Sequence, residues 1–132
     1  MPGLWAPTLK QAGRTPPTVL DALVLGYQGA QIIKGLLSPD ERVFGIITNG
    51  GDADNVIPAE AAARYRIRAR NQSRLENLRE RVVNCFEGAA QQIGATCTIE
   101  SLGGYLDLRA NRSLAAAFRA NAESLGRVFL DP

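Results

Sequence analysis

Histidine is the most informative absence in this sequence. None of the 132 residues is His. A catalytic zinc site usually takes three protein ligands from His, Asp, Glu or Cys, and His is the commonest of them. Nucleophilic triads also rely on a His base in most cases. The absence of His therefore counts against any hypothesis in which this chain alone is an enzyme.

Cysteine is scarce as well, with only Cys85 and Cys97 present. Two cysteines cannot form a disulfide framework, and their spacing does not match a zinc-binding motif. Cys85 falls on the apolar face of a predicted helix. We therefore expect both thiols to be reduced and buried.

Long apolar runs are also missing. No segment approaches the ~20 residues that a membrane-spanning helix needs, and the start, MPGLWAPTLK, lacks the continuous apolar stretch of a signal peptide. We expect a soluble, cytoplasmic protein that does not bind membranes. The formal net charge of +2 is too small to indicate a nucleic-acid partner. The hydrophobic content of 45% over 132 residues instead suits one globular domain that folds without disulfides or metals.

Capping residues and hydrophobic periodicity predict the elements that follow. Residues 1–17 hold four of the seven prolines and show no periodicity, so we interpret them as an extended leader. Thr18 and Asp21 resemble a capping box and predict a helix to about residue 37. A second capping box, formed by Ser73 and Glu76, predicts a helix that ends at Gly94. The remaining predicted elements are strands at 43–49, 61–70 and 96–102 and a helix at about 112–125.

The order of these elements is helix, strand, strand, helix, strand, followed by the last helix. One additional strand at the start would give β-α-β-β-α-β, which is the ferredoxin-like sandwich. The sequence therefore predicts an α+β fold, in which an antiparallel sheet carries two helices on one face and leaves the other face open. The first strand is expected to be missing or replaced.

A row of arginines is the most distinctive local feature. In residues 61–70, AAARYRIRAR, every second residue from position 64 to position 70 is Arg. Strand geometry places Arg64, Arg66, Arg68 and Arg70 on one face, about 6.5–7 Å apart. The row is either a solvated face that aids solubility or a site that binds a carboxylate or phosphate, because a guanidinium offers two parallel donors. RNA binding is disfavoured, because no aromatic side chain accompanies the row to stack on bases.

The segment TNGGDADN, residues 48–55, resembles two known ligand loops without matching either. A calcium loop that began at Asp52 would need an oxygen ligand and a glycine where Val56 and Ile57 stand. A phosphate-binding loop would need a Lys and a following helix. We expect a polar turn instead, and we assign no role to Asp52 or Asp54.

Residues 45–71, GIITNGGDADNVIPAEAAARYRIRARN, resemble the dimerisation (lid) domain of metallopeptidase family twenty. This family of zinc-dependent amidohydrolases and exopeptidases includes aminoacylases, hippurate hydrolases, aminobenzoyl-glutamate hydrolases and glutamate-releasing carboxypeptidases. The pattern is a strand, Gly-Gly, a short loop, Asn-Val-Ile-Pro and a strand that carries arginines. The resemblance extends over about residues 18–130, with VLDALVLGYQGAQIIKGL similar to the helix that precedes this segment in the family.

The resemblance implies a homodimer and a small anionic amide substrate, an N-acyl amino acid or a dipeptide. The family's Asn before Val-Ile-Pro corresponds to Asn55, and its Arg for the substrate carboxylate corresponds to Arg68. Arg64, Arg66 and Arg70 are further candidates for anion contacts. Residues 18–103 would form the lid, and residues 104–132 would lead back to a catalytic domain outside this chain, where zinc or another divalent metal is expected. The resemblance therefore implies that this chain has no catalytic residue and binds no metal, and that it hydrolyses no substrate alone.

The sequence departs from the family in its N-terminal part. The family's lid has a Gly-x-x-x-His-Ala segment before its first helix, whereas this chain has GLWAPTLKQAGRTPP. The alternative interpretation therefore stays open: a free-standing ferredoxin-like binding or regulatory module that uses the Arg row for an anionic ligand.

Overall fold

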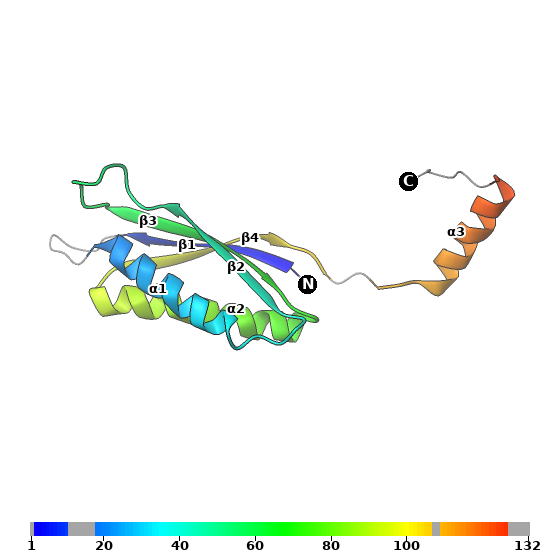
Figure 1. Ribbon diagram of the computed structural model, residues 1–132, viewed down its shortest axis with the longest axis horizontal. Coiled ribbons are helices and arrows are strands. Elements are labelled where there is room, and N and C mark those ends of the chain that lie inside the picture. The colour runs from blue at the N-terminus through cyan, green and yellow to red at the C-terminus, as the bar shows by residue number, and fades with distance from the viewer. Residues whose placement is uncertain (1, 11–17, 107–108, 127–132) are drawn as a thin grey trace.

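A four-stranded antiparallel sheet forms one layer of the molecule (Figure 1). The computed structural model describes residues 2–10, 18–106 and 109–126. The strand order is β2-β3-β1-β4, so the central pair joins the first and third strands of the sequence. The strands are β1 (Pro2–Lys10), β2 (Arg42–Asn49), β3 (Glu60–Arg68) and β4 (Thr96–Gly104). This is the α+β, ferredoxin-like arrangement that the sequence predicts.

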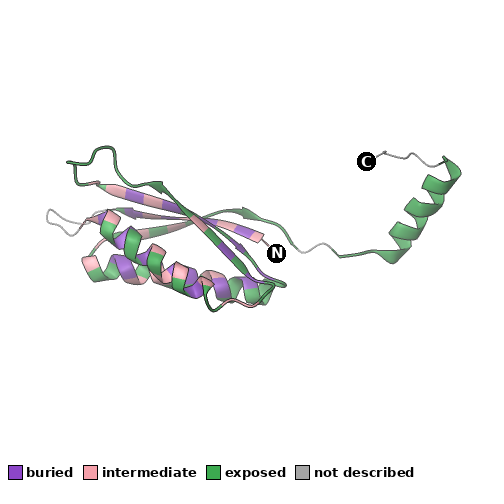
Figure 2. Cartoon of the chain, in the orientation of Figure 1, coloured by how far each residue is buried: buried purple, intermediate pink, exposed green. Residues whose placement is uncertain are grey.

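Two helices, α1 (Val19–Lys34) and α2 (Gln72–Ile93), cover one face of this sheet. The core lies between the helix layer and the sheet, where Figure 2 shows the buried residues. Its largest fully buried side chains are Tyr65, Phe86, Leu9, Leu23, Ile67, Leu78 and Val19. Alternation along β3 produces this division, because Tyr65 and Ile67 point into the core while the intervening arginines are exposed.

The structure corrects the expectation of an N-terminal leader and a missing first strand. Residues 2–10 form β1, which lies in the middle of the sheet between β3 and β4. Gly3, Trp5, Pro7 and Leu9 are its buried positions, so the strand alternates as a half-buried strand should. The prolines concealed it, because Pro is normally confined to edge strands. Residues 11–17 of the expected leader lie outside the described residues.

The helix ends confirm one predicted cap and correct another. At α1, the Asp21 N–H donates to Thr18 Oγ1 over 3.1 Å, and the Thr18 N–H donates to Asp21 Oδ2 over 3.1 Å. This reciprocal pair is the predicted capping box. At α2, the cap is Asn71, whose Oδ1 accepts from the Arg74 N–H over 3.0 Å. The prediction from Ser73 and Glu76 is therefore wrong, because the helix already begins at Gln72 and Asn71 caps the Arg74 N–H.

At the helix C-termini, one predicted end is confirmed and the other is corrected. The helix α2 ends at Gly94, as predicted, with the residue in the left-handed region at φ 70°. The helix α1 ends at Lys34, a few residues before the predicted end near residue 37.

Glycines bring the two helices close together. A Cβ on Gly26 would lie 2.6 Å from Phe86 Cδ1, and one on Gly29 would lie 2.9 Å from Cys85 Sγ. The buried face of α2 consequently centres on Phe86, and Cys85 is only half-buried at its edge. Cys97 is also half-buried, so the thiols are unpaired, as expected, but not fully buried.

The last helix, α3 (Arg112–Ser124), contacts none of the other described helices and strands. All of its residues are exposed, including the apolar Leu114 and Phe118. Within the described ranges, no helix combines the length and the apolar character that crossing a bilayer requires.

Candidate functional site

The loop between β2 and β3 borders a hollow of about 630 Å³. The hollow is lined by Thr18 and Leu20 of the α1 start and by the segment 50–58. Asn49 Oδ1 accepts from the Gly51 N–H over 3.0 Å, and Gly51 has φ 113°, which favours glycine. This turn projects the rest of the loop away from the sheet, and Asn55 lies exposed on it. Asp52 and Asp54 are exposed on the same loop.

The Arg row borders a second hollow, of about 490 Å³, on the open face of the sheet. Three cations of β3 and one of α1 line it together with apolar side chains of β1 and β2. The lining residues are Arg64, Arg66, Arg68, Lys34, Leu4, Phe44, Gly45 and Ile46. Strand register explains the grouping, because Arg66 lies between Phe44 on one side and Leu4 on the other. No carboxylate is part of this lining.

The three lining arginines are available for a ligand. Ion pairs between described residues join Lys10 to Glu60 at 3.1 Å and Arg74 to Glu41 at 3.2 Å, away from this hollow. Arg64, Arg66 and Arg68 are exposed, and no side-chain hydrogen bond ties any of them to another described residue. Their positive charge is therefore uncompensated locally.

Two other arginines near this face are not part of the hollow. The Arg42 guanidinium donates to the carbonyl oxygens of Pro39 and Glu41, each over 2.6 Å, and so closes the turn before β2. Arg70 lies exposed after the end of β3 and does not line the hollow. The structure thus brings together Arg64, Arg66 and Arg68, and not the whole predicted row.

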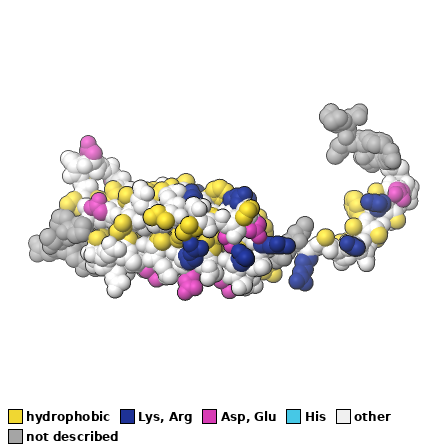
Figure 3. All heavy atoms as spheres, turned by 60° about the horizontal axis from the view of Figure 1, so that its bottom comes forward, with side chains coloured by type: hydrophobic (Ala, Val, Ile, Leu, Met, Phe, Trp, Pro, Cys, Tyr) yellow, Lys and Arg dark blue, Asp and Glu magenta, His cyan; other side chains and the backbone are white. Residues whose placement is uncertain are grey.

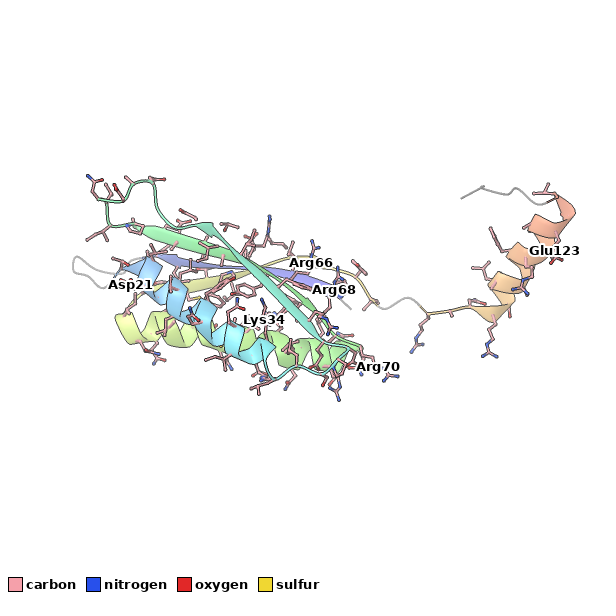
Figure 4. The ribbon with its side chains drawn as sticks, viewed as in Figure 1. Asp21, Lys34, Arg66, Arg68, Arg70 and Glu123 are labelled. Carbon is pink, nitrogen blue, oxygen red and sulfur yellow. The ribbon has the colours of Figure 1, made fainter. Side chains whose placement is uncertain are left out.

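The β2–β3 loop, which carries Asn55, and the labelled Arg68 lie at opposite ends of β3 (Figure 4). Arg68 is the last residue of β3, and Asn55 precedes the first residue of that strand. At ~3.3 Å per residue, the strand alone separates them by about 26 Å. A small substrate cannot contact both residues of one chain.

Neither cysteine has the properties of a nucleophile. Burial raises the pKa of the Cys97 thiol to about 11, with a further contribution from the Glu87 carboxylate. Burial also raises the pKa of Cys85. The reactive thiolate is therefore rare at neutral pH. The described residues also contain no group of three or more Cys, Asp or Glu side chains that could hold a metal ion, so their donors do not fit the family's metal.

Sequence reasoning missed Lys34 and the apolar part of the second hollow. Phe44 and Ile46 alternate along β2 and could have been placed on the Arg face from that period. Leu4 could not, because its strand was not predicted. Lys34 reaches this hollow only through the packing of α1 against the sheet.

Comparison with known proteins supports the family resemblance. Residues 30–93 match the peptidase dimerisation domain family. The chain is 36% identical over 112 residues to an Xaa-Arg dipeptidase of Mus musculus and 37% identical over 114 residues to an Xaa-Arg dipeptidase of Homo sapiens. Each match covers 84% of this chain but 26% of the relative, so the chain spans about a quarter of the length of these curated relatives.

Solved structures support the fold. An aminobenzoyl-glutamate utilization protein from Klebsiella pneumoniae has a TM-score of 0.75 at 17% identity, covering 95% of this chain and 33% of that one. A hydantoinase/carbamoylase family amidase from Burkholderia ambifaria has a TM-score of 0.72 at 13% identity, with the same coverage. The sheet with its two helices, the matched segment and the curated relatives agree: residues 30–93 of this chain form a peptidase dimerisation domain, in line with the resemblance to metallopeptidase family twenty.

Proposed function

We propose that this chain is the lid and dimerisation portion of a metal-dependent amidohydrolase that cleaves an amide bond in a dipeptide or N-acyl amino acid. Enzymes of this family are metal-dependent. The metal, proposed to be zinc, and the catalytic residues belong to a part of the enzyme that this chain does not include. The curated relatives are named as dipeptidases and are about four times as long as the matched segment, which supports this division.

The observation that carries the proposal is the free edge of β2. Among the described strands, β2 pairs only with β3, and the apolar Phe44, Ile46 and Ile47 along it are 42–52% exposed. The adjacent helix α1 adds exposed Leu25 and Ile32, which is 69% exposed. Figure 3 brings the helix side forward and shows hydrophobic side chains at its surface. An unpaired edge beside exposed apolar side chains is suited to a second copy of the same strand.

Two-fold pairing of this edge would bring the two predicted substrate-binding residues, Asn55 and Arg68, close together across the dimer. A two-fold axis perpendicular to the sheet sets the two β2 strands antiparallel. Arg42, at the start of β2, lies opposite Arg68, and the loop with Asn55 follows the end of β2. The antiparallel pair therefore places the Arg68 end of one sheet beside the Asn55 loop of its partner. We propose that each substrate contacts Asn55 of one copy and Arg68 of the other.

Sedimentation measurements test the self-association. We expect the chain to form a dimer, and we expect the double change Leu25→Glu and Ile32→Glu to shift it to a monomer, because each dimer would bury four carboxylates without partners. Leu102→Glu is the matched control, since Leu102 is 45% exposed on β4, at the edge of the sheet opposite β2. A strictly monomeric wild-type chain at high concentration would contradict the proposal.

A mixing experiment tests the shared site. Asn55→Ala and Arg68→Ala variants are each expected to bind N-acetyl-L-glutamine weakly in calorimetry. Mixing and re-equilibrating them should restore about one site in four, because half of the dimers are then mixed and one of their two sites keeps both residues. A mixture that binds no better than its components would contradict the assignment of one site to two copies.

A further inference from the structure

The hollow on the Arg face holds more positive charge than one carboxylate requires. One guanidinium is enough to grip a carboxylate through two parallel hydrogen bonds. Here Arg64, Arg66, Arg68 and Lys34 line the same hollow. The further inference rests on the proposed function, in which Arg68 binds the substrate's α-carboxylate. Arg66 and Arg64 are then left to meet another part of the substrate.

The geometry of β3 places Arg66 within reach of the substrate's side chain. Alternate residues of a strand lie about 6.5–7 Å apart on the same face. The two carboxylates of an aspartyl or glutamyl residue are separated by a short aliphatic chain, which can bridge neighbouring guanidinium groups. Leu4 and Phe44 lie on either side of Arg66 and supply an apolar surface for that aliphatic chain.

Little opposing charge is available on this face. Among the described strands, the acidic residue nearest to the row on the open face is Glu100. It lies opposite Ala6 of β1, which places it two strands, or about 10 Å, from the position of Arg64 on β3. Arginine also stays protonated at every physiological pH. A cationic substrate side chain at this position would therefore meet like charges, whereas a carboxylate would be attracted.

We infer that this hollow selects substrates in which the amino acid bearing the free α-carboxylate is acidic, with Arg66 binding its side-chain carboxylate and Arg68 its α-carboxylate. Arg64 and Lys34 add to the positive field around the same position. This preference is opposite to the one in the name of the curated Xaa-Arg dipeptidases, whose substrate side chain is a cation.

Calorimetry with three N-acetyl amino acids on the full chain tests this specificity. N-acetyl-L-glutamate carries the second carboxylate, N-acetyl-L-glutamine has nearly the same shape without it, and N-acetyl-L-arginine carries a cation instead. We expect the glutamate derivative to bind about tenfold more tightly than the glutamine derivative, as one charged hydrogen-bonded pair would give. The arginine derivative should bind most weakly.

Single variants separate the roles of the two arginines. Arg66→Ala should remove the preference for glutamate while leaving the glutamine affinity within about twofold, because only the side-chain contact is lost. Arg68→Ala should weaken both derivatives. Arg81→Ala is the matched control, since it removes the same charge from an exposed position on α2 in the other layer, and it should change neither affinity.

The outcomes distinguish this inference from the function on which it rests. Equal affinity for the glutamate and glutamine derivatives, with both still dependent on Arg68, would overturn the specificity and leave the proposed carboxylate site intact. A preference for the arginine derivative would overturn the specificity as well. Binding that does not depend on Arg68 at all would overturn both.

Discussion

At the scale of single residues, Tyr65 shows how the core accommodates a polar group. Its ring lies over Gly45, where a Cβ would approach Tyr65 Cε1 to 2.3 Å. It also packs against Phe86 with ring centroids 5.3 Å apart. The hydroxyl is buried and has no hydrogen-bond partner among the described residues. Burial raises the pKa of this phenol above its usual value. The ring thus stabilises the core while its hydroxyl does not.

The change Tyr65→Phe is therefore expected to leave the free energy of unfolding unchanged or to raise it by up to about 1 kcal/mol, since a desolvated donor without a partner costs stability. Urea denaturation measures this. Tyr27→Phe is the matched control, because the Tyr27 hydroxyl donates to the Gly45 carbonyl oxygen over 3.3 Å, and its loss should cost about 0.5–1.5 kcal/mol. A loss of more than about 1 kcal/mol on Tyr65→Phe would show that the hydroxyl does have a partner.

At the scale of elements, the start of α1 depends on the reciprocal hydrogen bonds between Thr18 and Asp21. Thr18 Oγ1 accepts from the Asp21 backbone and also donates to Asp21 Oδ2 over 2.7 Å. The change Thr18→Ala removes the cap and should lower the free energy of unfolding by about 1 kcal/mol. Thermal or urea unfolding checks this value. An unchanged stability would mean that the helix start is held by its packing on the sheet rather than by the cap.

The same hydrogen bonds make the stability of α1 depend on pH. Hydrogen bonds from the Thr18 side chain and backbone lower the pKa of Asp21 in the folded chain. A carboxyl with a lowered folded pKa contributes stability above its unfolded pKa, and the contribution is lost as the pH falls through the folded pKa. The difference in melting temperature between the wild type and Asp21→Asn should thus shrink on acidification from neutral pH. A difference that grows on acidification would contradict the role of the ionised carboxylate.

At the scale of the whole molecule, the sheet with α1 and α2 forms a self-contained unit, whereas α3 stands apart from it. A 13-residue helix is close to the shortest that is stable in water without packing. Its exposed Leu114 and Phe118 suit a surface that the described chain does not supply. The stability of the sheet domain should therefore not depend on α3.

Removal of residues 111–132 is accordingly expected to change the melting temperature by less than about 2 °C. Calorimetry of the truncated chain measures this. Removal of residues 1–10 is the contrasting variant, and it should abolish folding, because it deletes the strand between β3 and β4. A decrease of more than about 5 °C without α3 would show that this helix contributes to the domain.

The sequence by itself determined the local features of this protein. Periods of two and of 3.6 residues fix which side chains share a face, so the sequence predicted the alternation of Arg66 with Tyr65 and Ile67. Residue types at the helix ends predicted the cap at Thr18 and the end of α2 at Gly94. The Asn-Val-Ile-Pro motif carried the family. These features depend on residues that are close together in the chain.

Only the tertiary structure decided what depends on pairing between distant segments. Strand pairing placed residues 2–10 in the middle of the sheet despite Pro2 and Pro7, and the same pairing brought Leu4 beside Arg66. The packing of α1 added Lys34 to that hollow. The length of β3 keeps Asn55 away from Arg68 within one copy. Local periodicity carries no information on such neighbours, because they depend on which strands pair and how the helices pack when the sheet buries its apolar face.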